Sequence, residues 1–464
     1  MKEFDTICAI ATPVGVGGIA IIRVSGNDAE TAVGKIAFPK NGKKIEELES
    51  HRLTLSHIKA SQSGEMLDEA LVVVMRGSNS YTGETVVEIN CHGGYLAAES
   101  IMEELFSIGV RQADAGEFTR RAFVNGKLDL VRAEAVIDLI HANSEKGQSN
   151  AAKILSGKLS EKVNKIRDKA VLFAANISAV ADYPDEIDEI PRDELIDRIG
   201  GISGDIDDML GGFSQGKIMR DGILTVIAGR PNVGKSSLLN ALTRTDRAIV
   251  TDIPGTTRDT VEEYVNINGI ALRLIDTAGI RESENSVERI GIDRAKENIK
   301  SADLCLFVLD VSVGITPKDL EIFEYTKGKN VIVILNKIDI AKGADTSAVA
   351  KSLGVNEENI ILTSLPKEGK VLGITELEEL ITRMFMSGNI SKDDVFISND
   401  RQKNALIKAK KIAMEMTKSV ECGMPADMLY VDLEELIAAL GEITGQTVQD
   451  EIIDKVFERF CVGK

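Results

Sequence analysis

The chain has 464 residues, enough for roughly two to four domains that each bury a core of their own. Its 73 acidic residues outnumber 55 lysines and arginines, and the net charge of −18 argues against a protein that holds nucleic acid on a basic surface. No apolar run approaches the roughly 18 residues of a membrane span, and the start lacks the pattern of a signal peptide, so we expect a cytoplasmic protein without membrane contact.

The first part of the chain, residues 1–124, predicts an α+β domain. Short apolar runs at 19–26, 70–77 and 85–94 predict strands, and the amphipathic run 95–109 predicts a helix. From residue 128 to about residue 182 the apolar residues recur at steps of three and four, which predicts a long helix in a bundle. Its buried stripe is expected to contain Leu155, Leu159, Ile166, Ala170, Phe173, Ile177 and Val180.

Acidic residues are concentrated at 182–208, which hold 11 acids but only two arginines. This short stretch therefore supplies half of the net charge. We interpret it as a solvated face or as a dock for a basic partner.

Residues 217–384 predict an α/β domain, because five nearly continuous apolar runs alternate with helical patterns. The pair Asn268-Gly269 is typical of a hairpin turn, so one strand should run antiparallel to the others. The helical pattern resumes after residue 388, with Ala405, Leu406, Ala409, Ile412, Ala413 and Met416, and later Leu433, Leu436, Ile437, Leu440 and Ile443. The α/β domain is therefore predicted to be inserted in a helical domain made of 125–216 and 385–464.

A phosphate-binding motif follows the first of these apolar runs. Residues 229–236 read GRPNVGKS, which matches GxxxxGK[ST] between a strand and a helix. Backbone N–H groups and the helix amino terminus suit phosphates, Lys235 suits the β and γ oxygens, and Ser236 suits Mg²⁺.

Three further motifs indicate a switch-type GTPase. Residues 336–339 read NKID, and the Asp339 carboxylate can accept two hydrogen bonds from guanine that adenine does not offer. Residues 276–279 read DTAG, and 251–259 read TDIPGTTRD, where Thr256 or Thr257 can close on Mg²⁺. Ile280 stands where Ras-like enzymes place a Gln that orients the attacking water. Hydrolysis therefore needs another group to polarise the water. Any acidic residue of the segment 281–289 could orient it.

These motifs, with SVERIGIDRA, NSYTGETVVEINCHGG and the terminal Cys461-Val462-Gly463-Lys464, resemble the tRNA-modification GTPase family MnmE, also called TrmE, over the whole chain. The resemblance implies an amino-terminal folate-binding domain that dimerises, a helical domain, and an inserted Ras-like P-loop G domain. It also implies C5 modification of the wobble uridine of certain tRNAs, by aminomethyl or carboxymethylaminomethyl addition, with an FAD-carrying flavoprotein partner, MnmG, in a heterotetramer.

The resemblance extends to individual site residues. Glu288 matches the family's water-orienting carboxylate, and Ser236 and Thr257 match its Mg²⁺ ligands. The ligands of a K⁺ ion that bridges the phosphates are matched by Asn232, Thr251, Ile253 and Thr256. The residues expected around GTP are Asn232, Val233, Gly234, Lys235, Ser236, Ser237, Thr251, Asp252, Ile253, Pro254, Gly255, Thr256, Thr257, Asp276, Thr277, Ala278, Gly279, Asn336, Lys337, Ile338 and Asp339. The guanine loop departs from the family, because Leu365 replaces a small residue there.

A tetrahydrofolate site is implied in the amino-terminal domain. Arg23, Glu88, Lys127 and Lys464 match folate contacts, and the one-carbon carrier would be a 5-formyl or 5,10-methylene derivative. Glu suits the adjacent donors of a pterin ring, while Arg and Lys suit carboxylates. The five cysteines are scattered, which favours reduced thiols, and Cys461 is either a packing residue or a group near the one-carbon unit.

Two other functions fit parts of the sequence. The GTPase motifs alone allow a ribosome assembly factor, although such factors usually carry a basic module and every segment here is net negative. A folate-dependent one-carbon enzyme with a regulatory G domain is the other alternative.

Overall fold

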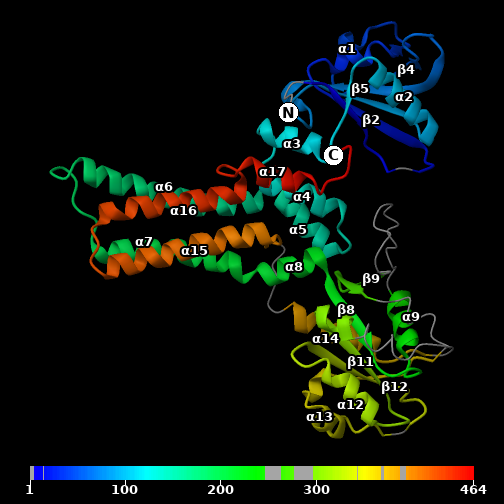
Figure 1. Ribbon diagram of the computed structural model, residues 1–464, viewed down its shortest axis with the longest axis vertical. Coiled ribbons are helices and arrows are strands. Elements are labelled where there is room, and N and C mark those ends of the chain that lie inside the picture. The colour runs from blue at the N-terminus through cyan, green and yellow to red at the C-terminus, as the bar shows by residue number, and fades with distance from the viewer. Residues whose placement is uncertain are drawn as a thin grey trace. The chain divides into compact units, whose positions relative to one another are not determined.

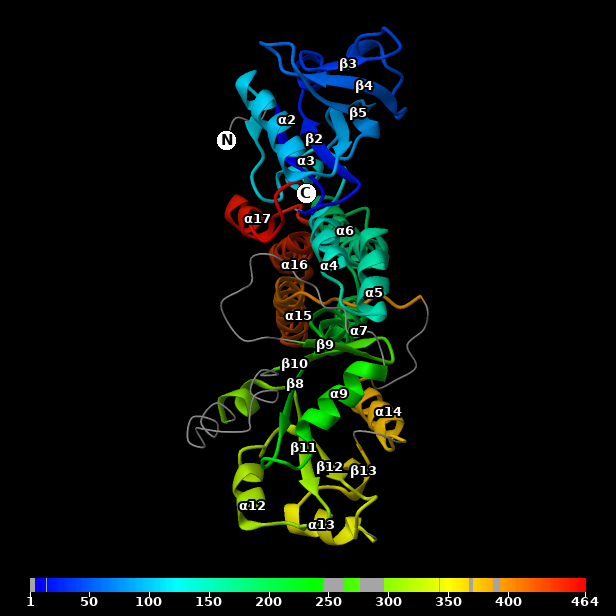
Figure 2. The same cartoon turned by 90° about the vertical axis from the view of Figure 1, so that its right-hand side faces the viewer.

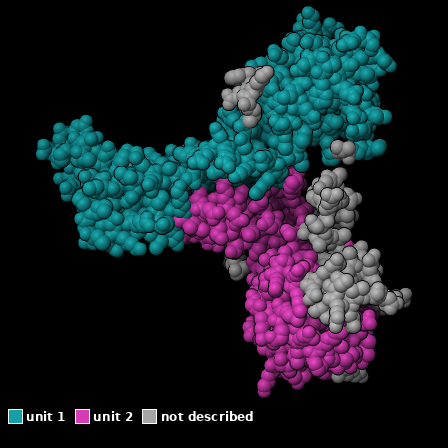
Figure 3. Space-filling model, in the orientation of Figure 1, with its two compact units in different colours: residues 1–137, 154–202, 408–464 teal, residues 138–153, 203–407 magenta. Residues whose placement is uncertain are grey.

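The computed structural model describes residues 5–13, 15–245, 263–275, 296–341, 343–366, 370–386 and 393–464, and every structural statement below concerns these residues. The chain divides into two compact units (Figure 3). Unit 1 contains residues 1–137, 154–202 and 408–464, and unit 2 contains 138–153 and 203–407. Figure 1 labels the elements of both units.

Unit 1 contains a seven-stranded sheet in the order β3-β4-β5-β6-β2-β1-β7. Neighbouring strands are antiparallel except β1 and β7, which are parallel. The strands are β1 (Ile7–Ile10), β2 (Ile19–Ser25), β3 (Ala37–Pro39), β4 (Thr54–Lys59), β5 (Met66–Met75), β6 (Val86–His92) and β7 (Arg111–Gln112).

Helices cover one face of this sheet. The short α1 (Ala29–Val33) and the amphipathic α2 (Tyr95–Ser107) pack on strand residues such as Ile22, Val72 and Ile89. Strand side chains alternate between faces, so this face forms the core while Leu55 and Leu71 on the other face remain exposed. The prediction of an α+β amino-terminal part is confirmed.

The helical part of unit 1 is built on α6 (Lys158–Asp182), which packs against α16 (Leu429–Thr444). The predicted stripe is largely confirmed, because Leu159, Ile166, Ala170, Phe173 and Ile177 are buried. One detail was wrong: Leu155 does not belong to this helix. The chain turns at Gly157, whose φ is +97°, and Leu155 ends the preceding helix α5 (Glu145–Leu155).

The remaining helices of unit 1 are α3 (Glu117–Val124) and α17 (Asp450–Phe457). Four helices have residues in both units: α4 (Leu130–Ile140), α5, α7 (Arg192–Gly211) and α15 (Asp400–Glu421). The six apolar residues predicted for α15 are all buried. On α16, Leu433, Leu436, Leu440 and Ile443 are buried, while Ile437 is half-buried.

Unit 2 holds a six-stranded sheet in the order β13-β12-β11-β8-β10-β9, in which only β9 is antiparallel to its neighbour. The predicted hairpin is confirmed: Ile267 pairs with Ile270 across Asn268 and Gly269, which both have positive φ. The strands are β8 (Ile223–Ala228), β9 (Glu263–Ile267), β10 (Ile270–Leu274), β11 (Leu304–Asp310), β12 (Asn330–Asn336) and β13 (Ile360–Thr363).

Helices cover both faces of this sheet (Figure 2), which explains why every residue of β11 is buried. On one face lie α9 (Lys235–Thr245) and α14 (Ile374–Phe385). On the other lie α12 (Pro317–Glu324) and α13 (Thr346–Leu353). A further helix, α8 (Phe213–Asp221), leads into β8. The predicted inserted α/β fold with a phosphate loop is thereby confirmed.

Candidate functional site

The phosphate loop joins β8 to α9 at residues 229–234. Two of its glycines are required by close packing. Gly229 has a φ of +140°, and a Cβ there would lie 2.4 Å from the Val308 carbonyl oxygen. A Cβ on Gly234 would lie 2.0 Å from Nδ2 of Asn336. The loop can therefore approach the neighbouring strands only because these positions carry no side chain.

Lys235 is the first residue of α9, and its side chain folds back over the loop. Its Nζ donates hydrogen bonds to the carbonyl oxygens of Gly229, at 2.7 Å, and Arg230, at 2.8 Å. Desolvation by burial lowers the pKa of Lys235 to about 8. A desolvated cation at a helix amino terminus is well suited to a phosphate group.

The predicted base-reading motif is joined directly to this loop. Asn336 ends β12, and its Nδ2 donates to the Val233 carbonyl oxygen at 2.9 Å. Thr363, at the end of β13, donates through Oγ1 to Oδ1 of Asn336 at 3.2 Å. The amide of Asn336 is thus held by two neighbouring segments, and the exposed side chain of Asp339 follows three residues later.

Lys337 and Asp310 fix the same edge of the sheet. Lys337 has a φ of +69°, and its Nζ donates to Oδ2 of Asp310 at 2.6 Å. Burial acts to raise the pKa of Asp310, but the hydrogen bonds from Lys337 and Ser312 outweigh it and lower that pKa. The carboxyl ends of β11 and β12 are therefore tied together beside the phosphate loop.

The phosphate loop also has an anchor on its outer side. Nε of Arg230 donates to Oδ1 of Asp319 at 2.7 Å, and the Asp319 side chain is fully buried. Oδ2 of Asp319 accepts from the backbone N–H and the hydroxyl of Thr316, at 2.9 and 2.7 Å, which caps α12. One buried carboxylate therefore connects the loop to the start of a helix.

The unusual Leu365 is accommodated in the protein interior. It is 8% exposed and belongs to the hydrophobic cluster that contains residues of α9 and α14. The preceding Ser364 exchanges two backbone hydrogen bonds with Leu372, which fixes the loop after β13. The larger side chain is therefore turned into the core.

The residues predicted to bind GTP, together with the predicted catalytic residue Glu288, divide into two groups. Those that lie within the described residues and belong to the phosphate loop and NKID segments are Asn232, Val233, Gly234, Lys235, Ser236, Ser237, Asn336, Lys337, Ile338 and Asp339. Those that lie outside the described residues are Thr251, Asp252, Ile253, Pro254, Gly255, Thr256, Thr257, Asp276, Thr277, Ala278, Gly279 and Glu288. Asn232 has a φ of +64°, in the left-handed region.

A second cluster lies in unit 1 and contains three of the four predicted folate residues. Arg23 on β2 pairs with Glu88 on β6, and its Nε lies 2.8 Å from Oε1 of Glu88. Its Nη1 donates to the Gly463 carbonyl oxygen at 3.1 Å. The Arg23 guanidinium carbon lies 5.6 Å from the ring centres of both Tyr81 and Phe118.

The carboxyl-terminal tail completes this cluster. Val462 bridges to Ala115, and a Cβ on Gly463 would lie 2.4 Å from the Ile10 carbonyl oxygen. Burial, together with the positive charge of Arg23, lowers the pKa of Lys464 although Glu88 opposes this. The tail thus places a partly desolvated cation beside Arg23 and Glu88.

Lys127 and Cys461 take other positions. Nζ of Lys127 donates to the Ser78 carbonyl oxygen, and no contact recorded among the described residues joins Lys127 to Arg23, Glu88 or Lys464. The Cys461 side chain is exposed, while its carbonyl oxygen accepts from the Gly116 N–H at 3.4 Å. The structure therefore brings together three of the four folate candidates.

Sequence reasoning missed several residues of both clusters. Asp319 had a recognisable signal, because Thr316 and Asp319 have the spacing of a capping box before an apolar run. Asp310 ends an apolar strand and was equally visible. Tyr81 and Phe118 had no comparable signal, since only the folded sheet brings them to Arg23.

Among the helices that the structure describes, none combines the length and apolar character required to cross a membrane.

Comparison with known proteins finds matches over nearly the whole chain. The family model "MnmE helical domain" matches residues 130–461, and "GTP-binding protein TrmE N-terminus" matches residues 6–127. The chain is 45% identical to "tRNA modification GTPase MnmE" of Alkaliphilus oremlandii over 462 residues, covering 99% of each chain. Proteins of the same description from Thermoanaerobacter pseudethanolicus and Geobacillus thermodenitrificans are each 44% identical, and the match covers 99% and 100% of this chain and 100% of theirs.

Proposed function

The chain belongs to the MnmE family of tRNA modification GTPases, and from that membership we propose a K⁺-stimulated GTP hydrolase that works with an FAD-containing, MnmG-type partner. The pair would modify the wobble uridine of certain tRNAs at C5, adding an aminomethyl or carboxymethylaminomethyl group. The broader activity, GTP hydrolysis in tRNA modification, is that of the family itself.

The observation that carries the nucleotide part of the proposal is the bond between Asn336 and the Val233 carbonyl oxygen. It fixes the segment proposed to read guanine against the loop proposed to hold the phosphates. A nucleotide that spans both would therefore meet a preorganised site, with Asp339 at its base and Lys235 at its phosphates.

For hydrolysis we assign roles to residues that surround the phosphates. Lys235 would neutralise the β and γ oxygens, Ser236 and Thr257 would hold Mg²⁺, and Glu288 would orient the attacking water. A K⁺ ion would supply positive charge at the phosphate bridge, as an arginine finger does, held by Asn232, Thr251, the Ile253 carbonyl and Thr256. Asn232 has a left-handed backbone, with a φ of +64°, and its side-chain oxygen is a suitable ligand type for such an ion.

The K⁺ assignment predicts a clear cation dependence. GTP turnover by the full chain should be much faster in KCl than in NaCl at equal ionic strength, because the smaller ion fits the same oxygen ligands poorly. Initial rates of phosphate release at saturating GTP measure this. Glu288→Ala should lower the rate in both salts while leaving GTP affinity nearly unchanged. Equal wild-type rates in KCl and NaCl would contradict the assignment.

For the one-carbon carrier we propose a tetrahydrofolate site at Arg23, Glu88 and Lys464, with Lys127 as a further contact. The carrier would be a 5-formyl or 5,10-methylene derivative. Glu88 can accept hydrogen bonds from a pterin, and two cations suit the glutamate carboxylates of folate. The exposed Cys461 lies three residues before Lys464, which keeps a role near the one-carbon unit within the proposal.

For assembly we propose a homodimer formed by the amino-terminal domain and a heterotetramer with the flavoprotein. The exposed part of the second sheet face, at β4 and β5, supports the dimer, since Leu55 and Leu71 are neighbours there and are each 39% exposed. Because half of the negative charge lies at 182–208, we propose that the partner supplies most of the tRNA affinity. The domain boundaries 1–124, 125–216 with 385–464, and 217–384, and a cytoplasmic location, belong to the same proposal.

Nucleoside analysis by mass spectrometry tests the tRNA part. tRNA from cells that lack this protein should lose the C5 modification of the wobble uridine, and a plasmid copy of the gene should restore it. A copy carrying Glu288→Ala should restore little of it. An unchanged modification profile together with a defect in ribosome assembly would favour the assembly-factor function instead.

A further inference from the structure

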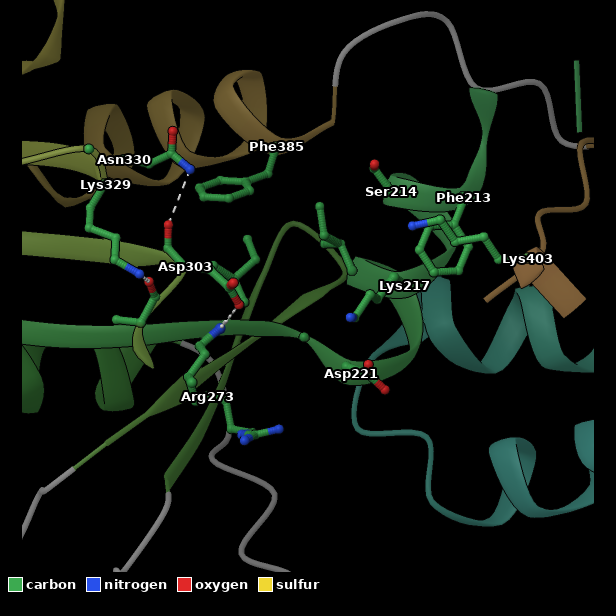
Figure 4. Close-up of a pocket in the computed structure, with 16 residues that line it drawn as sticks. Phe213, Ser214, Lys217, Asp221, Arg273, Asp303, Lys329, Asn330, Phe385 and Lys403 are labelled. Carbon is green, nitrogen blue, oxygen red and sulfur yellow. Dashed lines mark hydrogen bonds between the residues drawn. The ribbon is translucent and has the colours of Figure 1, made fainter. Parts of the chain in front are cut away.

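A pocket of about 580 Å³ lies within unit 2 (Figure 4). Its wall includes Ile223, Asp303 and Asn330, which stand at the amino-terminal ends of β8, β11 and β12. These strands are parallel and carry the phosphate loop and Asn336 at their carboxyl ends. The pocket and the proposed GTP site therefore lie at opposite ends of the parallel strands of one sheet.

Charged side chains in the pocket wall are mostly positive, although the whole chain carries a net charge of −18. Two carboxylates, Asp221 and Asp303, line the pocket. The lining cations are Lys217, Arg273, Lys329 and Lys403. A concave surface lined by an excess of one charge concentrates ions of the opposite sign.

Hydrogen bonds inside the wall already engage some of these groups. Oδ2 of Asp303 accepts a hydrogen bond from the backbone N–H of Leu224, the second residue of β8, at 3.0 Å. Nζ of Lys329 donates to the Ala302 carbonyl oxygen at 3.1 Å. Oδ2 of Asp303 and Nζ of Lys329 are thus engaged by backbone groups near the ends of neighbouring strands, and no ion pair between Asp303 and a lysine is recorded among the described residues.

Lys217 and Lys403 provide the uncompensated charge. Lys217 stands on α8, and Nζ of Lys403 lies 4.4 Å from the ring centre of Phe213, which holds it by a cation–π contact. Figure 4 shows both ammonium groups directed into the pocket. No carboxylate within ion-pair distance of either lysine is recorded in the described part of the chain. Among the described residues no partner balances their charge at ion-pair distance, so solvent ions or a ligand can supply the counter-charge.

We propose that this pocket binds a phosphate-bearing anion, as a site separate from the one for GTP. Two ammonium groups can each bind phosphate oxygens, and the rings of Phe213 and Phe385 in the wall offer apolar surface to the rest of the ligand. Only Gly222 separates α8 from β8, so a ligand held by Lys217 and the strand ends would brace that joint.

Binding of inorganic pyrophosphate to the full chain tests this site. The protein is first saturated with GDP and Mg²⁺ to block the phosphate loop, and calorimetric titration is done at constant ionic strength. Pyrophosphate should bind with one site per chain. Lys217→Ala with Lys403→Ala should weaken binding by about tenfold or more, because two charge-assisted contacts are lost. Lys351→Ala removes an exposed lysine of α13 and serves as the matched control.

The source of the phosphate is decided by a second arm with a single-stranded RNA hexamer. Binding of pyrophosphate that is lost in the double variant supports a free phosphate compound. Binding of the hexamer alone, lost in the same variant, supports the RNA backbone as the ligand. Replacing Lys403 removes its contact with Phe213, so a folding defect must be excluded. The single variant Lys217→Glu keeps that contact, and the unfolding temperatures of the variants are compared with that of the wild type. No binding to wild-type protein, or equal binding by wild type and the double variant, overturns the proposal.

Discussion

At the residue scale, the environment of the Lys235 side chain suits the binding of a phosphate group. Its ammonium group is satisfied by two loop carbonyl oxygens, yet burial lowers its pKa to about 8. No carboxylate contact of Lys235 is recorded among the described residues, and a buried ammonium group gains much when a phosphate supplies the opposite charge. In its proposed role, we expect the residue to stabilise the bound nucleotide more than it stabilises the empty loop.

This pKa predicts a pH-dependent affinity for GTP. Below about pH 8 Lys235 is already protonated, so it adds no pH dependence. Above that pH the free protein must take up a proton on binding, and affinity should fall by up to about tenfold per pH unit. Calorimetry near pH 9 in two buffers of different ionisation enthalpy should show uptake of up to one proton. Lys235→Arg should abolish the uptake, and its absence in wild type would rule out the lowered pKa.

The same shift affects stability with a defined sign. Unfolded lysine has a pKa of 10.5, so between about pH 8 and 10.5 the unfolded chain binds more protons than the folded chain. The cost of burying Lys235 is therefore fully present below pH 8. It is relieved as the pH rises through that window.

At the element scale, the phosphate loop is held between two secondary-structure ends. Asn336 ties it to the end of β12, and the Arg230–Asp319 pair ties it to the start of α12. Strand ends and helix starts are fixed by their own hydrogen bonds, so they position the loop more firmly than solvent contacts would. Loop geometry thus depends on residues that need not touch the nucleotide.

Asp319→Asn should weaken this support. The change removes the buried charge that faces Arg230, and the free energy of unfolding of unit 2 should fall by about 1–3 kcal/mol. GTP affinity should fall as well, because the loop loses an anchor. Denaturant titration and nucleotide binding measure the two effects. Glu321→Gln, an exposed position on the same helix, is the control, and equal results for both variants would contradict the anchoring role.

At the scale of the whole molecule, the last residues of the chain help to build a site near its start. The Gly463 carbonyl accepts from Arg23 across 440 residues of sequence, and Val462 bridges to Ala115. The left-handed φ of Gly463, +97°, and its closeness to Ile10 allow this approach. Unit 1 therefore joins both ends of the chain in one candidate site.

Gly463→Ala should disturb this arrangement. A Cβ 2.4 Å from the Ile10 carbonyl oxygen must displace the tail, so Lys464 would leave Arg23 and Glu88. Binding of 5-formyltetrahydrofolate should weaken by about tenfold, on the scale of one lost charge-assisted contact, while GTP turnover stays unchanged. Fluorescence titration measures the affinity. Val462→Ala, at a side chain that is 49% exposed, is the control, and unaltered folate affinity in Gly463→Ala would remove the tail from the site.

Local patterns predicted the elements better than their ends. Continuous apolar runs revealed the buried strands of unit 2, and Asn268-Gly269 revealed the antiparallel hairpin, because both signals act within a few residues. The helix predicted through Leu155 instead begins at Lys158. The turn at Gly157 was missed because the apolar spacing continues across it.

The sequence by itself determined three things about this chain: a phosphate loop, a motif proposed to read guanine, and the family to which the chain belongs. These follow from residue types at short, fixed spacings. Only the tertiary structure decided which distant groups meet, such as Arg23 with Gly463, Arg230 with Asp319, and Lys217 with Lys403 in one pocket. Such contacts depend on strand order and helix packing, which arise from burial of the whole core and leave no local pattern at the residues that finally touch.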